Sequence, residues 1–244
     1  MEKRGYSHWK DFFPYEARLN QDQIAEFLKR QFDLNKISII EAPYGIGKSI
    51  AMISSVLSTG KKAIFVTCNN AAHHAIVDEV LKINQKLKKD LIVSSVIGKE
   101  KLCMHDSFDY ELCERMKQNK ECEYYENSYS KEKKLSHKSI LLLNEIISIM
   151  KKNPNILLHY SLPRYIKERC FEKKLCPYEI TIELAKRSDV VILDYFHVFT
   201  FLNSTTLKRM AIDPSKSILL VDLSLIHISE PTRPLYISYA VFCL

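Results

Sequence analysis

A short glycine-containing loop carries the clearest chemistry in this sequence. Residues 42–49 read Ala-Pro-Tyr-Gly-Ile-Gly-Lys-Ser and match the pattern G-x-x-x-x-G-K-S/T, except that alanine replaces the first glycine. Gly45 and Gly47 allow the backbone to curl so that its N–H groups face a polyphosphate, and the following helix adds partial positive charge. Lys48 would reach the β- and γ-phosphates, and Ser49 would bind Mg²⁺. The loop predicts a nucleotide site, but by itself it does not distinguish a kinase, a transporter and a helicase.

Thiols form the second group of residues that could do chemistry. Four of them are spaced C-x9-C-x8-C-x53-C, at Cys103, Cys113, Cys122 and Cys176. A set of thiolates alone suits an iron–sulfur cluster or zinc, but the sequence lacks the C-x-x-C pairs of a zinc ribbon. The alternative for each cysteine is a buried, inert thiol. Cys170 is a fifth candidate in the same region, and Cys68 is expected to be a small core residue.

Alternating apolar strands and helices must position both groups. Strands are expected at residues 36–42, 63–67, 91–96, 190–193 and 217–221, and helices at 48–57, 71–87, 139–150, 178–187 and 195–202. This alternation predicts an α/β fold with a mostly parallel, doubly wound sheet. The glycine loop lies between a strand and a helix, as its motif requires, which disfavours a chance glycine turn. The pattern stops between residues 103 and 176, where an insertion with a small core of its own is expected.

The composition is that of a globular protein, with 244 residues of which 46% are hydrophobic and 27% charged. No apolar run reaches the roughly 18 residues of a membrane span, and the polar start argues against a secretory signal. A cytoplasmic location is expected, or a nuclear one if the source is eukaryotic. Seven cysteines there indicate buried or metal-bound thiols, because disulfides are rare in these compartments. The net charge of +7 fits a polyanionic partner such as nucleic acid, or simply a basic solvated surface.

The order of the motifs resembles that of XPD and DinG-like helicases. Residues 13–21, with Phe-Pro-Tyr followed by an arginine and a glutamine, resemble the adenine-recognising entry segment, and the glycine loop follows. Lys-Leu-Cys at residues 101–103 resembles the segment of the first cluster cysteine, and Cys-Pro-Tyr at residues 176–178 closely resembles that of the fourth. Residues 189–195 and 217–222 are similar to the next segment and to the strand that leads into the D-E-A-H box. The similarity runs through residues 12–222 in the right order.

This resemblance implies an ATP-dependent 5′→3′ DNA helicase with a RecA-like motor fold and a [4Fe–4S] cluster. Motor domain 1 would comprise residues 1–102 and 177–222, with the cluster insertion at residues 103–176. The implied nucleotide-binding residues are Arg18, Gln21, Gly45, Gly47, Lys48 and Ser49. The implied cluster ligands are Cys103, Cys113, Cys122 and Cys176, and Ser49 and Asp222 would hold Mg²⁺. Single-stranded and forked DNA are the implied partners. The sequence does not distinguish excision repair, transcription-linked opening and recovery of stalled replication as the pathway.

The chain departs from the family after Asp222, where it reads Asp-Leu-Ser-Leu in place of D-E-A-H. Asp222 keeps the Mg²⁺ ligand, but the glutamate that orients the attacking water is gone, and Glu230 is too distant to replace it. Residues 223–244 contain one arginine and no lysine, and they resemble translated sequencing-adapter read-through. They are expected to be a non-native tail; the alternative is a degenerate protein with a divergent end. We expect weak ATP binding without useful hydrolysis.

Basic and aromatic residues flank the cysteine region and could grip the DNA backbone and stack on bases. They are Lys99, Lys101, His105, Tyr124, Tyr125, Arg164, Tyr165 and Lys167. Each of them could equally be a solvated surface residue. His73 and His74, at the start of a predicted helix, are expected to be surface or capping residues.

Two other functions fit the same residues. One is a P-loop kinase or ATPase with a zinc-binding insertion, and the other is a nucleotide- and nucleic-acid-binding fragment without enzymatic activity. A brown colour in anaerobically purified protein would favour the iron–sulfur helicase over the zinc protein. DNA-stimulated hydrolysis by a full-length protein would separate the helicase from the binding fragment.

Overall fold

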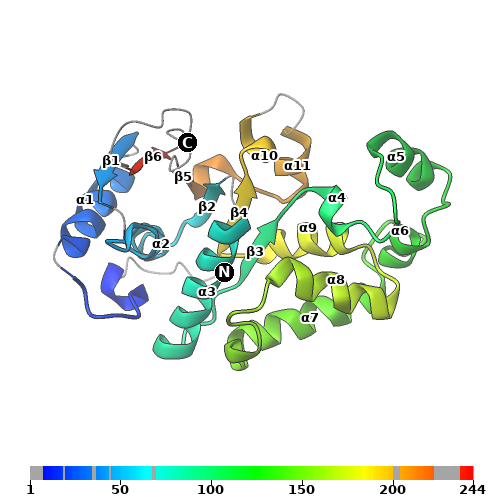
Figure 1. The fold of residues 1–244 in the computed structure, drawn as a ribbon, viewed down its shortest axis with the longest axis horizontal. Helices are drawn as coiled ribbons and strands as arrows, with labels where there is room; N and C mark the ends of the chain where they lie inside the picture. Colours follow the sequence, from blue (N-terminus) through cyan, green and yellow to red (C-terminus); the bar gives the residue numbers. More distant parts are fainter. Residues whose placement is uncertain are drawn as a thin grey trace.

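The computed structural model describes residues 8–18, 20–34, 37–43, 45–67, 70–199, 204–222 and 237–243, the last of these as backbone only. Its six strands form one sheet in the order β1-β6-β5-β2-β4-β3 (Figure 1). The strands are β1 Ser38–Ala42, β2 Lys62–Thr67, β3 Val93–Val96, β4 Val190–Asp194, β5 Ser217–Asp222 and β6 Ile237–Cys243. All strands except β6 run in the same direction, because β6 is antiparallel to both of its neighbours. The expected α/β fold with a mostly parallel sheet is therefore confirmed.

The helices connect the strands and extend the molecule to one side of the sheet. They are η1 Trp9–Phe12, α1 Gln21–Asp33, α2 Lys48–Ser58, α3 Asn70–Leu87, α4 Lys99–Leu102, α5 Tyr110–Gln118, α6 Glu123–Ser128, α7 His137–Lys152, η2 Pro154–Ile156, α8 Leu162–Lys173, α9 Pro177–Arg187, α10 Phe196–Phe199, α11 Ser204–Arg209 and η4 Pro214–Lys216. Six of these α-helices were not expected from the sequence, namely α1, α4, α5, α6, α8 and α11. Figure 1 shows α5 and α6 at the end of the molecule farthest from β1.

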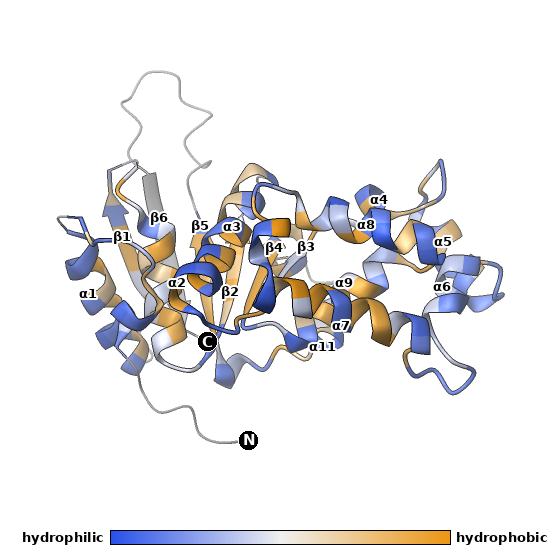
Figure 2. Cartoon of the chain, turned by 90° about the horizontal axis from the view of Figure 1, so that it is seen from below, coloured by the Kyte–Doolittle hydropathy of each residue, from blue (hydrophilic) through white to orange (hydrophobic). Residues whose placement is uncertain are grey.

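Helices cover both faces of the sheet because side chains along each strand alternate in direction. On β2, Phe65 packs into a core formed with α1, α2 and α3, whereas the adjacent Ile64 packs into a second core with α9 and α11. Both side chains are at least 98% buried. Strands buried on both faces read as continuous apolar runs, which the hydrophobic colouring of β2 and β4 in Figure 2 shows. The sheet is thus doubly wound, as predicted.

The predicted insertion has no apolar core of its own in the part of the chain that the structure describes. Leu143 and Ile146 of α7 and Ile166 of α8 belong to the same cluster of buried residues as Leu81 of α3. Asn84 of α3 donates a hydrogen bond of 2.9 Å to the carbonyl oxygen of Met150 in α7. The expectation of a separate small core is therefore wrong, because α7 and α8 share one core with α1, α2 and α3. The cysteines Cys103, Cys113, Cys122 and Cys176 lie toward the other end of the insertion, around α4, α5, α6 and the start of α9.

Part of the C-terminal segment expected to be a non-native tail takes a place in the sheet. Residues 237–243 form β6 between β1 and β5, with Ile237 opposite Ala42 and Tyr239 opposite Asp222. Residues 223–236, which include Glu230, lie outside the described residues. None of the helices that the structure describes combines the length and apolar character needed to cross a bilayer.

Candidate nucleotide and cysteine sites

The predicted phosphate loop connects β1 to α2 through two glycines with a left-handed backbone. Gly45 and Gly47 have φ angles of 78° and 82°, a region that residues with a side chain rarely adopt. Gly47 is also the residue before α2, and a Cβ atom there would collide with Nε2 of Gln21. Both positions therefore require glycine for a physical reason, as the motif predicts. Tyr44 of the loop lies outside the described residues.

Lys48 is buried where α2 begins, with its ammonium group directed at the loop. Its Nζ donates hydrogen bonds to the carbonyl oxygens of Ala42 at 2.7 Å and of Pro43 at 2.8 Å. Burial lowers the pKa of Lys48, and the negative charge of Asp222 opposes this shift. Asp222 ends β5 and is 7% exposed. The structure thus brings the predicted phosphate ligand and the predicted Mg²⁺ ligand to one place, beside the half-buried Ser49.

Gln21 links the entry segment to this loop, which no local sequence pattern could show. Its Oε1 accepts a hydrogen bond of 2.7 Å from the backbone N–H of Arg18. Its Nε2 donates one of 2.6 Å to the carbonyl oxygen of Ile46, between the two glycines. Gln21 is 5% exposed, whereas Arg18 is exposed. The structure therefore brings Gln21, but not the guanidinium of Arg18, into contact with the loop in the described residues.

The four predicted ligand cysteines all lie at the ends or on the faces of short helices. Cys103 follows α4, Cys113 lies within α5, and Cys122 and Cys176 precede α6 and α9. Burial raises the pKa of Cys176 to about 12. Burial also raises the pKa of Cys113, against the positive charges of Lys117 and Lys99.

The cysteines approach one another in pairs. The thiol of Cys113 is close enough to that of Cys103 for the two to interact electrostatically, and the same holds for Cys176 and Cys122. His105 adds an imidazole Nε2 at 3.6 Å from the Cys122 sulfur. No group of three or more histidine, cysteine or acidic side chains is close enough to hold one metal ion in the part of the chain that the structure describes. The donor set suits a thiolate-bound metal in type and location, but the four thiols do not converge on a single point.

Cys170 differs from these four cysteines in its surroundings. It is fully buried on α8 within the apolar core, and burial raises its pKa far above the usual range. Such a thiol packs as a small apolar side chain. Cys68 lies outside the described residues, and no side chain is described for Cys243 in β6.

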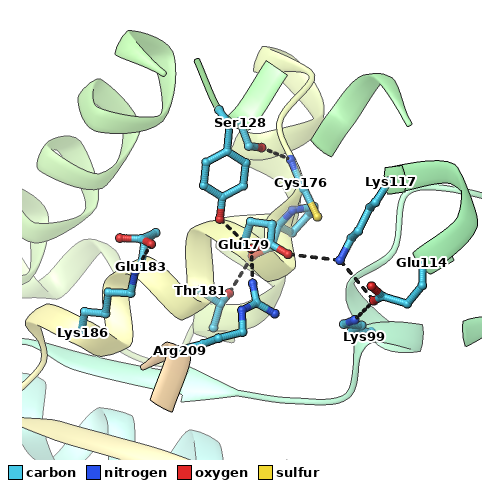
Figure 3. Close-up of polar contacts among 12 residues, drawn as sticks. Lys99, Glu114, Lys117, Ser128, Cys176, Glu179, Thr181, Glu183, Lys186 and Arg209 are labelled. Atoms are coloured by element: carbon cyan, nitrogen blue, oxygen red, sulfur yellow. Dashed lines mark hydrogen bonds and ion pairs between the residues drawn. The ribbon is translucent and has the colours of Figure 1, made fainter. Parts of the chain in front are cut away.

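A buried carboxylate next to the cysteine segment was not anticipated from the sequence. Glu179, in the first turn of α9, is 0% exposed. It accepts a hydrogen bond of 2.7 Å from the Tyr129 hydroxyl, and it forms ion pairs with Lys117 at 3.3 Å and with Arg209 (Figure 3). The only local signal is its position directly after Cys-Pro-Tyr, in a helix whose next carboxylate, Glu183, lies one turn further along the same face. Buried charges are rare unless they are paired, and here the partners come from distant segments.

His73 is an interior residue, so its assignment to the surface was wrong. It is 2% exposed, with Nδ1 at 2.9 Å from the Ser95 hydroxyl and Nε2 at 3.2 Å from a carboxylate oxygen of Asp194. Burial alone would raise the pKa of Asp194, but the nearby imidazole of His73 outweighs this effect and lowers that pKa. His74 is partly exposed and lies 3.5 Å from Asp78. The side chain of His73 points inward because α3 packs on the carboxyl ends of β3 and β4.

The basic and aromatic residues predicted to contact DNA do not form one surface. Lys99 is paired with Glu114 at 2.7 Å, and Tyr125 lies under Lys117, so both are engaged inside the protein. Lys101 and Lys167 are side by side, since Nζ of Lys167 donates to the Lys101 carbonyl oxygen at 2.9 Å. The other members are Arg164, bound to Glu168 at 2.9 Å, the half-buried Tyr165, and Tyr124, whose ring meets that of His105 edge to face. The structure thus gathers Lys101 and Lys167 on α4 and α8, but not the whole set.

Comparison with known proteins identifies the family. The chain resembles solved structures described as "XPD_Helicase" (TM-score 0.57) and "Truncated XPD" (TM-score 0.51), each at 18% identity over 85% of this chain. It spans about a third of the first of these, at 32%, and about half of the second, at 52%. Comparison with curated protein sequences gives no match. A family model, DEAD_2, matches residues 69–225, more than half of the chain. The chain therefore belongs to the DEAD_2 family of XPD-type helicase domains.

Proposed function

We propose that this chain is the ATP-binding first motor domain of an ATP-dependent DNA helicase. The observation that carries the proposal is the junction of Gly45, Gly47, Lys48 and Asp222, which offers backbone N–H groups, an ammonium and a carboxylate to a Mg²⁺-bound polyphosphate. Lys48 would exchange its bonds to loop carbonyls for bonds to the β- and γ-phosphates. Ser49 and Asp222 would hold Mg²⁺, and Gln21 would recognise the adenine beside the loop.

Nucleotide binding can be tested with two matched lysine variants. Like Lys48, Lys62 is a partly buried lysine that donates to backbone carbonyls, those of Ala185 at 2.9 Å and Lys186 at 3.2 Å, but it lies away from the loop. Lys48→Met should weaken binding of a fluorescent ATP analogue by about 100-fold, since a charge-assisted bond to phosphate is lost. Lys62→Met should bind it as the unmodified chain does. Equal affinity of both variants would refute the assignment of the loop.

The resemblance adds a [4Fe–4S] cluster held by Cys103, Cys113, Cys122 and Cys176. Four thiols at one end of the molecule, with the positive charge of Lys117 within reach of two of them, support this assignment. A bound cluster would cross-link the segments around α4, α5, α6 and α9. Zinc is the alternative metal for the same donors. Iron and acid-labile sulfide in anaerobically purified protein would separate the two.

DNA is the proposed partner, as single strands and forks, with 5′→3′ translocation by the whole protein in the cytoplasm or nucleus. Lys101 and Lys167 support phosphate contact, because they lie against each other at the rim of a cavity of about 140 Å³ between α3 and α8. Asn70 lines this cavity and lies 3.5 Å from Nζ of Lys101. The variant with both lysines changed to Gln should bind single-stranded DNA more weakly. The slope of log affinity against log salt concentration should become shallower by the amount expected for the loss of about two phosphate contacts. Unchanged affinity and salt slope would exclude this surface.

The residue after Asp222 supports a second, narrower function for the chain as it stands. Leucine at position 223 cannot orient a water for attack on the γ-phosphate. We therefore infer a nucleotide- and DNA-binding chain that does not turn over ATP at a useful rate. DNA-stimulated phosphate release by this chain would contradict the inference. A full-length protein that carries Glu-Ala-His after this aspartate should hydrolyse ATP.

A further inference from the structure

Apolar packing contributes little to the position of α5, because its apolar residues Leu112 and Met116 are only half-buried and belong to neither of the two apolar cores. The helix spans Tyr110–Gln118, and none of its residues is buried. An isolated helix of this length is marginal in water. Contacts with the rest of the protein must therefore hold α5 in place. The described ones are ion pairs and cation–π contacts made by its charged and aromatic side chains.

Lys117 supplies the central contact. Its side chain is 12% exposed, and Nζ lies 3.3 Å from Oε1 of Glu179 and 3.4 Å from Glu114 of its own helix. The same ammonium group stacks over the Tyr125 ring at 4.9 Å. Burial lowers the pKa of Lys117, but the negative charges of Glu179 and Glu114 outweigh this effect and raise it. Lys117 is therefore charged whenever α5 is docked at neutral pH.

Glu179 is held in place from the opposite side. Its Oε2 accepts from the Tyr129 hydroxyl at 2.7 Å and pairs with Arg209 of α11, which leaves Oε1 for Lys117 (Figure 3). A fully buried carboxylate is costly unless each oxygen has a partner. The network thus joins the insertion, through Lys117 and Tyr129, to α9 and α11 of the motor domain.

Two predicted ligands lie on the same two helices as this ion pair. Cys113 precedes Lys117 by four residues on α5, so both side chains share one helix face. Cys176 precedes α9, whose first turn contains Glu179. Lys117 lies within electrostatic reach of both thiols. The pairing of Lys117 with Glu179 therefore sets how α5 and its thiol face the start of α9.

We propose that Glu179 is a positioning residue of the cysteine site: it docks α5 through Lys117 and so places the Cys113 thiol relative to Cys176. The inference rests on the proposed function only in taking these two cysteines for metal ligands. The docking of α5 itself is a property of the chain without metal. It predicts that loss of the Glu179 charge releases α5 while the motor core stays folded.

The test compares Glu179→Gln with Glu183→Gln in the full chain without metal. Glu183 is a matched control on the same helix, since it is also nearly buried, and its ion pairs among the described residues are with Lys186 and Arg187 of α9 itself. Alkylation of Cys113 is followed by peptide mass spectrometry, together with hydrogen exchange in α5. In Glu179→Gln, both rates should rise at least about tenfold, the factor expected when local opening becomes about 1.4 kcal/mol easier. In Glu183→Gln they should stay within about twofold of the unmodified chain.

Three further measurements make the outcome decisive. Glu179→Asp keeps the charge and should restore most of the protection of Cys113. If Glu179→Gln loses the helical circular dichroism of the whole domain, Lys117→Met replaces it, with the exposed Lys134→Met as its control. Equal alkylation rates in the test and control variants would overturn the inference. Iron bound per chain after reconstitution should fall in Glu179→Gln but not in Glu183→Gln. If neither the unmodified chain nor any variant binds iron, but the alkylation rates still differ, the docking of α5 by Glu179 is supported and the proposed cluster is refuted.

Discussion

Nε2 of Gln21 occupies the space in which a Cβ atom of residue 47 would stand, while it donates a hydrogen bond to the Ile46 carbonyl. The entry segment can therefore pack against the phosphate loop only because residue 47 is a glycine, which leaves room for the side chain of Gln21. Gly47 has a second reason to be glycine, its φ of 82°. These two constraints act on the same backbone atoms that would face the phosphates.

Gly47→Ala should consequently weaken nucleotide binding by more than about tenfold, because Gln21 must move and the loop is strained by roughly 1–2 kcal/mol. Gly98→Ala is the matched control, since its Cβ would meet nothing closer than 3.8 Å. Titration with a fluorescent ATP analogue and urea unfolding of both variants check this. Equal affinities would mean that the loop does not hold the phosphates in this conformation.

The shared core predicts that the insertion and the motor unfold together. Leu143 of α7 is 1% exposed, whereas Leu141 on the same helix is 52% exposed. Leu143→Ala should lower the free energy of unfolding by about 2–5 kcal/mol, through lost burial and a cavity. Leu141→Ala should change it by less than about 0.5 kcal/mol. Two separate denaturation transitions, with only one affected by Leu143→Ala, would contradict a common core.

Stability should fall in mildly acidic solution because of His197. This residue of α10 is 6% exposed, and its Nδ1 has no hydrogen-bond partner among the described residues. Burial lowers its pKa below the usual histidine value of 6.5, although Asp194 opposes the shift. The unfolded chain therefore takes up the proton first, so the stabilisation is complete above pH 6.5 and declines as the pH falls toward the folded-state pKa.

His197→Phe removes this titration and should flatten the dependence of unfolding free energy on pH between neutral pH and pH 5. Urea denaturation at a series of pH values measures the difference between the two proteins. A histidine at the surface, such as His137, provides the control, because its replacement should leave the slope intact. Parallel curves for His197→Phe and the unmodified chain would exclude His197 as the source.

Metal content separates the five described cysteines. Replacement of any one of Cys103, Cys113, Cys122 and Cys176 by serine should reduce the iron and sulfide bound per chain by more than half, since a ligand is lost. Cys170→Ala, a small change inside the apolar core, should keep them. Colorimetric iron and sulfide assays after anaerobic reconstitution provide the measurement. Zinc in equimolar amount without sulfide would favour the alternative metal.

The sequence alone determined the features whose geometry is local. The phosphate loop could be identified because its glycines, lysine and serine act through the turn and helix in which they lie. The parallel sheet followed from apolar runs that are buried on both faces. The cysteine segment stood out through its spacing and the Cys-Pro-Tyr at residues 176–178.

Tertiary structure alone decided which polar residues are interior and which segments share a core. Glu179 and His73 look like ordinary polar residues at the starts of helices, and their burial depends on partners as distant as Arg209 and Asp194. From the sequence, the apolar faces of α7 and α8 could have packed only against each other, as a separate small core. In the folded chain they also pack with α3, which makes them part of the larger core. Residues 237–243, which were expected to belong to a non-native tail, form a strand, because strand pairing is made by backbone groups that every residue except proline offers in full. A contact between distant segments depends on how the whole chain folds, so local patterns do not encode it.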